Sequence, residues 1–244
     1  MLSSTLTLEN YTHTSPKILS SLEKIVEEWL KRSATCPLSV SLFDRANRFT
    51  SDFDKHPLVL QLLPFSSRLR HLRLTGDPEL LRPLLRLGSE DLPILNSFGM
   101  ECRGTVPDVP NIFHLVALQD VTIRMAVSFD PRSLPLQWSQ LTKLCLECKA
   151  IWTDQGQEGG LDLSGAFHVL RMCPMLMDCE IQVTQGSGDA DRVLDTSPIH
   201  LPHLQSLVLT VNVFQVIFRE WIPYLVVPNL RSLQVGKVIG GRLD

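Results

Sequence analysis

Two cysteines, Cys145 and Cys148, have the spacing in this chain that most resembles a chemical site, a Cys-x-x-Cys pair. Such a pair binds zinc or carries out thiol redox chemistry when both sulfur atoms meet on one side of the backbone. On a strand, residues three positions apart point to opposite faces, because side chains change face at every step. The surrounding sequence predicts a strand, with Cys145 outward and Cys148 inward, so we expect no metal or redox site. A thiol-dependent enzyme that uses Cys145 alone stays open as an alternative.

The other patterns do not predict catalysis or a cofactor. His200 and His203 flank a proline with no third ligand nearby, and the glycines at 159–160 lack the Gly-Lys-Ser/Thr of a phosphate loop. The chain has no Gly-x-Ser-x-Gly, the motif of a hydrolase nucleophile. Three arginines at 68, 70 and 73 form too small a basic patch for nucleic acid. We therefore expect no enzyme, no catalytic residue, no cofactor, no metal and no nucleic-acid partner.

Composition favours a folded, water-soluble chain. Apolar residues make up 44% and charged residues 20% of the 244 residues, and the net charge is −3. No apolar run approaches the roughly 18 residues that a membrane helix needs, and the first residues do not have the pattern of a secretory signal. Six cysteines are too few for a disulfide scaffold. An intracellular location, cytoplasmic or nuclear, without membrane contact is expected.

Leucine is in excess, with 42 copies, and its spacing shows how the chain is organised. A pattern of the form Leu-x-x-Leu-x-Leu, with apolar substitutions, recurs at intervals of about 27 residues, inside the range of leucine-rich repeats. Its copies are Leu69-Leu72-Leu74, Leu95-Phe98-Met100, Leu118-Val121-Ile123, Leu141-Leu144-Leu146, Leu176-Cys179-Ile181, Leu204-Leu207-Leu209 and Leu230-Leu233-Val235.

Each copy predicts a short strand whose alternate apolar residues point into a core that the neighbouring repeat completes. Residues 37–42 have the same alternation and predict one further strand before the first copy. The asparagine that joins successive turns of regular repeats is present only once, at Asn212. The expected fold class is therefore α/β, a degenerate leucine-rich-repeat solenoid with parallel strands on one side and helices and loops on the other.

Helix signals lie between and before the strands. Residues 16–32 form an apolar stripe of helical period behind Ser15 as the expected cap, and predict a helix that caps the end of the stack. Asp77 followed by Pro78 predicts a second helix start. Residues 164–172 predict another helix and 214–225 a weaker one, whereas glycine-rich stretches at 154–160 and 185–195 predict loops. The expected organisation is a polar N-terminus with a capping helix at 1–35, followed by the solenoid at 36–244.

Several short phrases of the sequence resemble a known family. They are the stretches 29–33 and 36–42, the stretch 167–176 and the stretch 199–207, which contain a Cys-Pro-x-Leu turn and a Leu-Pro-x-Leu-x-x-Leu turn. They resemble the mushroom-type fungal F-box proteins with leucine-rich-repeat tails, over about residues 16 to 236. The resemblance implies that the repeats recruit a protein for ubiquitination. An F-box, a helical motif that begins near Leu-Pro-x-Glu and docks on a Skp-type adaptor, is not seen before residue 16, so adaptor binding is doubtful.

If the strands build a core with one face, the opposite face is left for binding. Its polar residues are spread over a surface that suits a protein or peptide better than a small molecule. We expect a non-enzymatic protein-binding module with an unknown protein or peptide partner; a structural fragment without a partner is a further alternative. The candidate binding residues are His71, Arg73, Glu101, Asp120, Arg124, Lys143, Glu147, Asp178, Glu180 and Thr210.

Overall fold

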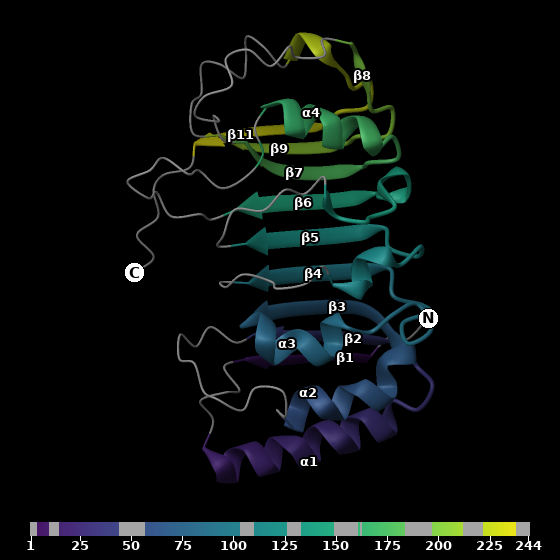
Figure 1. Cartoon of the computed structure of the whole chain (residues 1–244), viewed down its shortest axis with the longest axis vertical. Helices are drawn as coiled ribbons and strands as arrows, with labels where there is room; N and C mark the ends of the chain where they lie inside the picture. The colour runs from purple at the N-terminus through teal and green to yellow at the C-terminus, as the bar shows by residue number, and fades with distance from the viewer. Residues whose placement is uncertain are drawn as a thin grey trace. The chain divides into compact units, whose positions relative to one another are not determined.

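The structure is a computed structural model of the chain, and it describes residues 4–9, 15–43, 57–102, 110–125, 133–148, 161, 163–183, 197–211 and 222–237. It is an α/β protein with parallel strands (Figure 1), and it divides into two compact units, Met1–Leu118 and Gln119–Asp244. The predicted boundary at residue 35 falls inside the first unit. The loops predicted at 154–160 and 185–195, and most of the helix predicted at 214–225, lie outside the described residues.

Four parallel strands form the sheet of the first unit: β1 (Ser4–Glu9), β2 (Leu38–Phe43), β3 (Leu69–Gly76) and β4 (Ser97–Cys102). They lie side by side in chain order. The register places Val40, Leu72 and Phe98 opposite one another, and all three are buried. The predicted alternation is thereby confirmed for β2, β3 and β4. Strand β1 was not predicted from its sequence, because its apolar residues are only a pair of leucines among threonines.

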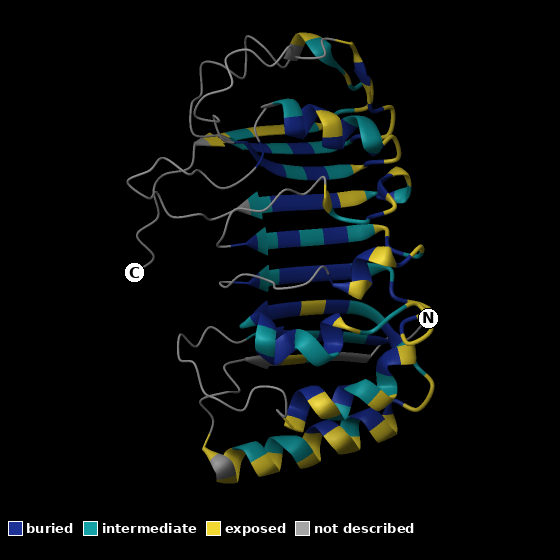
Figure 2. Ribbon diagram, in the orientation of Figure 1, coloured by how far each residue is buried: buried dark blue, intermediate teal, exposed yellow. Residues whose placement is uncertain are grey.

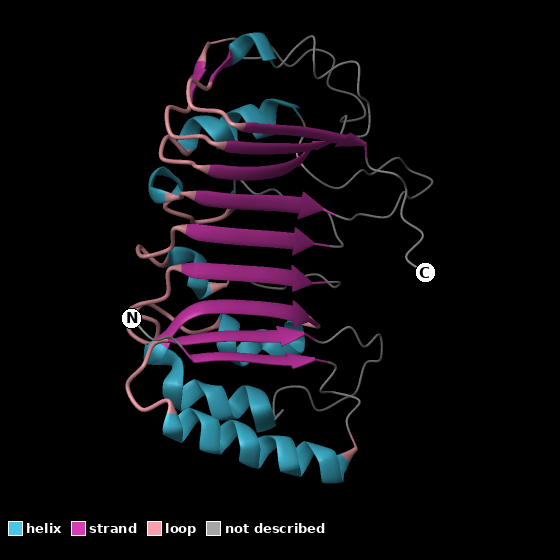
Figure 3. Cartoon of the chain, turned by 180° about the vertical axis from the view of Figure 1, so that it is seen from behind, coloured by secondary structure: helices cyan, strands magenta, loops and turns pink. Residues whose placement is uncertain are grey.

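Helices of the first unit are α1 (Pro16–Arg32), α2 (Pro57–Leu62) and α3 (Pro78–Leu85), with a 3-10 turn at Leu63–Arg68. The view from behind in Figure 3 shows α3 on one face of strands β1 to β3, with the opposite face of these strands toward the viewer. Helix α3 begins as predicted, because the Asp77 carboxylate accepts a hydrogen bond from the backbone N–H of Glu79 at 2.8 Å. Helix α1 has the predicted bounds, but the side chain of Ser15 makes no capping hydrogen bond.

Five parallel strands form the sheet of the second unit: β5 (Asp120–Met125), β6 (Lys143–Cys148), β7 (Asp178–Val183), β9 (Ser206–Val211) and β11 (Ser232–Lys237). Two short strands, β8 (Ile199–His200) and β10 (Leu225–Val226), pair separately. Helix α4 (Leu163–Met172) lies on one face of β7 and β9 (Figure 3) and buries Phe167 and Leu170. Within the described residues, no helix of either unit is long and apolar enough to cross a bilayer.

The described inward positions of β5, β6, β7 and β9 are buried as predicted (Figure 2), but Cys145 on β6 and Gln182 on β7, at outward positions, are buried as well. Cys179 and Leu207, which stand opposite each other in the register, are buried, as are Val121 and Leu144. Leu233 continues this row opposite Leu207 but is 46% exposed. The prediction that Leu233 is buried in the core is therefore wrong. Among the described strands, β11 has a neighbour on its β9 side only, so nothing described covers the outer flank of Leu233.

Candidate binding surface

The strands of the second unit direct their polar residues to the face opposite α4, and we call this set the polar face of unit 2. The strand period and the parallel register align these residues in rows, because equivalent positions of neighbouring strands stand about 4.8 Å apart. One row is Asp120, Lys143, Asp178 and Ser206, and the next is Thr122, Cys145, Glu180 and Val208. Arg124 stands opposite Glu147, and Gln182 opposite Thr210.

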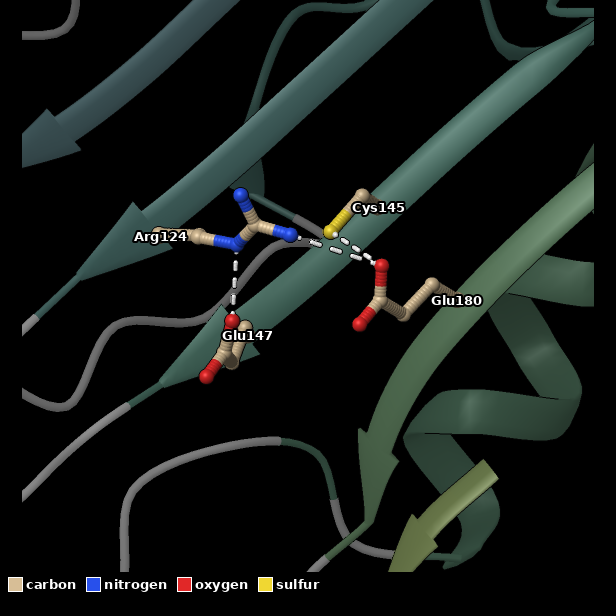
Figure 4. Close-up of polar contacts among 4 residues, drawn as sticks. All are labelled: Arg124, Cys145, Glu147 and Glu180. Atoms are coloured by element: carbon tan, nitrogen blue, oxygen red, sulfur yellow. Dashed lines mark hydrogen bonds and ion pairs between the residues drawn. The ribbon is translucent and has the colours of Figure 1, made fainter. Parts of the chain in front are cut away.

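A charged network joins strands β5, β6 and β7 on this face (Figure 4). Arg124 Nε donates to Glu147 Oε2 at 2.7 Å, and Arg124 Nη2 lies 3.5 Å from Glu180 Oε2. The Arg124 side chain is 23% exposed and that of Glu147 26%. One guanidinium therefore holds carboxylates from two other strands at the edge of solvent, where partial burial strengthens the attraction relative to a fully exposed pair.

A second, more exposed ion pair lies in the neighbouring row. Lys143 Nζ stands 3.2 Å from Asp178 Oδ2, and both side chains are about half exposed. Asp120 occupies the position beside Lys143 on β5. Pairs as exposed as this contribute little to folding, on the order of 0 to 1 kcal/mol. Across the polar face of unit 2, the carboxylates of Asp120, Glu147, Asp178 and Glu180 exceed the two cations, Arg124 and Lys143.

Cys145 lies beneath this network and is 8% exposed, so the strand direction predicted for it holds but its exposure does not. Its Sγ donates to Glu180 Oε2 at 3.3 Å. Burial, opposed by the charge of Arg124 and assisted by Glu180 and Glu147, raises the pKa of the thiol to about 12. The thiol form then dominates at neutral pH, whereas a cysteine nucleophile needs the thiolate. This argues against the thiol-enzyme alternative. The side chain of Cys148 lies outside the described residues.

The strands of the first unit carry a corresponding set, which we call the polar face of unit 1. Its residues are Ser39, Ser41 and Phe43 on β2, His71, Arg73 and Thr75 on β3, and Ser97, Gly99 and Glu101 on β4.

Two uncharged residues of the polar face of unit 1 position its arginine. The Arg73 guanidinium carbon lies 5.5 Å from the centroid of the Phe43 ring, and the stem of Arg73 runs over Gly99. Neither Phe43 nor Gly99 was among the predicted binding residues. The strand period could have placed Phe43 on this face, and a glycine inside a strand is a sign of close approach.

The predicted binding residues separate into the two units. The structure brings Arg124, Glu147 and Glu180 into one network, and it pairs Lys143 with Asp178. Thr210 lies one strand beyond, beside Gln182, and within the described residues it makes no hydrogen bond or ion pair with these charges. His71, Arg73 and Glu101 belong to the polar face of unit 1.

The polar faces were compared with the requirements of a metal site, and the chain with known proteins. Among the described side chains, no three of His, Cys, Asp and Glu gather where they could hold a metal ion. Comparisons of the chain with family models, curated proteins and solved structures found no significant match.

Proposed function

We propose that the chain is a non-enzymatic protein-binding module of the degenerate leucine-rich-repeat type, with α1 as the cap of its repeats. Strands that recur in parallel, with buried apolar residues in register from one strand to the next in β2 to β4 and in β5 to β9, support this architecture in each unit. Helix α1 buries Val26 and Leu30 and packs on α2, as a cover of the first repeat would. Most of the leucines are buried in the core, so we expect a partner protein to bind the polar faces.

The observation that carries the proposal is the charged network on the polar face of unit 2. Arg124, Glu147 and Glu180 come from three strands and remain partly exposed on the face that α4 does not cover. Four steps between five strands make a surface roughly 19 Å wide. Fixed charges spread over such a width orient a polypeptide partner and select its charge pattern more than they add affinity. The excess of carboxylates favours a segment with lysine or arginine.

The resemblance to fungal F-box proteins supports a more specific role, the recruitment of a protein for ubiquitination. In that role the polar faces bind the recruited protein, while a Skp-type adaptor binds elsewhere. The sequence contains no Leu-Pro-x-Glu. We therefore expect a purified Skp-type adaptor not to bind this chain in a calorimetric titration, and heat of binding at micromolar adaptor would contradict that expectation.

A comparative capture experiment tests the binding proposal. The wild-type chain and the double variant Asp178→Lys, Glu180→Lys are immobilised, and proteins retained from a fungal extract are quantified by mass spectrometry. Because both positions are on the polar face of unit 2 and partly exposed, we expect the variant to fold and to lose retained proteins.

A matched control keeps the charge change and moves it away from this face. Glu27→Lys, Glu28→Lys alters two exposed residues of α1 in the same way. Proteins retained by the wild type and by the α1 variant, but lost from the Asp178, Glu180 variant, would identify partners of the polar face. Equal retention by all three chains would contradict the proposal.

A further inference from the structure

Arg73 on the polar face of unit 1 is held in place without using its hydrogen-bonding capacity. Its guanidinium stacks on Phe43 from β2, and its stem lies over Gly99 from β4. A Cβ at position 99 would stand 3.2 Å from Arg73 Cγ, so the glycine makes the room that the stem occupies. The neighbours on two strands thus fix the direction of the side chain.

The N–H donors of the Arg73 guanidinium form no hydrogen bond within the described residues. Within the described part of the chain, the guanidinium has the ring contact with Phe43 but no hydrogen bond or ion pair. Arg124, on the other unit, is by contrast occupied by two carboxylates. A guanidinium presents five N–H donors in a planar fork that matches a carboxylate or phosphate.

A second polar group beside Arg73 is also unsatisfied. Thr75 follows two positions along β3, on the same face, and its side chain is only 5% exposed. Its Oγ1 has no hydrogen-bond partner within the described residues. A buried hydroxyl without a partner is unfavourable, and a ligand oxygen that hydrogen-bonds to it would remove that cost.

We propose that Arg73, with the Thr75 hydroxyl, binds an anionic oxygen group, a carboxylate or a phosphate, carried by an extended polypeptide. The inference rests on the proposed protein-binding function and specifies the partner chemistry at the polar face of unit 1. Ser41 stands beside Arg73 on β2 and His71 precedes it by two residues, so hydroxyl and imidazole groups border the position. Phe43 supplies the ring on which the guanidinium stacks.

The charges around this position restrict how the anion approaches. Among the described side chains of the face, β2 contributes no charge, β3 contributes His71 and Arg73, and β4 contributes Glu101. Glu101 stands opposite Thr75, one row beyond Arg73. Its carboxylate repels an anion placed over β4, so the ligand group is expected on the β2 side of Arg73 and Thr75, where the described side chains carry no charge.

Nuclear magnetic resonance of the arginine Nε–H groups tests the inference on the full chain. The ¹⁵N-labelled protein is titrated with inorganic phosphate and with three tripeptide amides, acetyl-Gly-Glu-Gly, acetyl-Gly-phosphoserine-Gly and acetyl-Gly-Gln-Gly. The Arg73 signal is assigned by its absence in Arg73→Lys, and the exposed Arg86 signal is the internal control. We expect a saturable shift of the Arg73 signal with the anionic ligands and none with the glutamine peptide.

Two variants test the positioning of Arg73 itself. Phe43→Leu removes the stacking ring, and Gly99→Ala fills the room under the stem; circular dichroism confirms that each is folded. Loss of a cation–π contact of about 0.5 to 2 kcal/mol corresponds to weakening of about two- to thirtyfold. We expect both variants to weaken the saturable shift, whereas Arg86→Lys leaves it unchanged.

The outcomes separate the ligand sources and the two proposals. Saturation by the phosphoserine peptide and phosphate alone, or by the glutamate peptide as well, would each support the inference and name the source. Shifts that do not saturate, or that are equal at Arg73 and Arg86, would overturn it. If Arg73 shows no saturable shift but the Asp178, Glu180 variant still loses captured proteins, only this inference is contradicted, because those two residues lie on the other unit. A saturable Arg73 shift without face-dependent capture would instead remove the proposed function.

Discussion

A single arginine, Arg68, joins the end of α1 to the start of β3. Its Nη2 donates to Ser33 Oγ at 2.7 Å and to the Cys36 carbonyl at 3.0 Å, and its Nη1 reaches the Leu30 carbonyl at 3.4 Å. The Phe65 ring lies 5.7 Å from its guanidinium carbon. The carbonyls at a helix C-terminus lack partners within the helix, and here a cationic fork from another element satisfies one of them.

Replacing the Arg68 guanidinium by a lysine ammonium group should destabilise the first unit. Arg68→Lys keeps the charge but cannot donate to all of these acceptors, so we expect a loss of about 1.5 to 3 kcal/mol in the free energy of unfolding. Urea unfolding monitored by circular dichroism measures the loss. The matched variant Arg86→Lys changes an exposed arginine of the same unit and should stay within about 0.5 kcal/mol. Equal values for the two variants would show that the Arg68 contacts contribute nothing specific.

Cys145 should be slow to react with alkylating agents. Burial raises its pKa from 9.0 to about 12, so at pH 8 its thiolate fraction is about a thousandfold below that of an ordinary thiol. The folded pKa lies above the unfolded one, so the thiol contributes stability below about pH 9 that is lost as the pH rises toward about 12. Peptide mapping after iodoacetamide pulses at pH 8, 9 and 10 should show rates rising tenfold per unit, with the half-exposed Cys36 labelled first. Rapid labelling of Cys145 at pH 8 would restore the thiol-enzyme alternative.

At this scale the sequence predicts which face a residue occupies but not what it touches. The alternation placed Arg124, Glu147 and Glu180 on one face, and the structure joins them. The partners of Arg68 lie 32 to 38 residues away in the chain, and no local pattern links them. The burial of Cys145 depends on how far the long side chains around it fold over the thiol, which spacing alone does not give.

The end of α1 has a residue in an unfavourable backbone conformation. Ala34 has a φ of 45°, in the left-handed region, where a Cβ costs roughly 1 to 2 kcal/mol and glycine is the usual residue. Its N–H still bonds the Lys31 carbonyl at 3.2 Å, so the turn is closed despite the strain.

Ala34→Gly should therefore stabilise the chain, although glycine adds entropy to the unfolded state. We expect a net gain of about 0.5 to 1 kcal/mol in thermal or urea unfolding. Ser33→Gly is the contrasting variant, because Ser33 has an ordinary helical φ of −68° and its Oγ donates to the Leu30 carbonyl. That variant should destabilise. A loss of stability in Ala34→Gly would mean that the turn does not adopt this conformation in solution.

Strand register in the second unit can be tested with a matched pair of leucines. Leu207 is fully buried and should cost about 2 to 5 kcal/mol when replaced by alanine. Leu233 occupies the equivalent position on β11 but is 46% exposed, so Leu233→Ala should cost less than half as much. Ser206→Ala and Thr210→Ala, on the polar face, should be nearly neutral. Equal costs at 206, 207 and 210 would show that the register is wrong.

Elements with a strong apolar period could be predicted from the sequence, and short or weakly patterned ones could not. Strands β3, β4, β5, β6, β7, β9 and β11 and helices α1, α3 and α4 match the expected positions. Strand β1 has little apolar signal of its own and pairs because β2 offers it an edge. Helix α2, six residues long, begins at Pro57 and was not predicted, because fewer than two turns leave no measurable helical period.

At the scale of the whole chain, each unit is a stack in which every strand meets only its neighbours. In unit 2, β7 lies between β6 and β9, and β9 between β7 and β11. Because each strand contacts only its neighbours, we expect a local defect to open the neighbouring strands before distant ones. The composition, however rich in leucine, does not reveal this, because the same leucines could form one central core.

Hydrogen exchange measures how far a local defect spreads. Leu207→Ala removes core volume from β9, so we expect backbone N–H groups of β7, β9 and β11 to lose protection by about 10- to 1,000-fold, while β2 and β3 of the first unit change by less than threefold. The reciprocal variant Leu72→Ala, buried in β3, should reverse the pattern. If both variants lowered protection equally in every strand, the two units would unfold as one cooperative body. A loss of protection confined to the unit that carries the mutation would instead show that one unit can be perturbed while the other keeps its structure. The separate tests of Arg73 and of Asp178 with Glu180 depend on this independence.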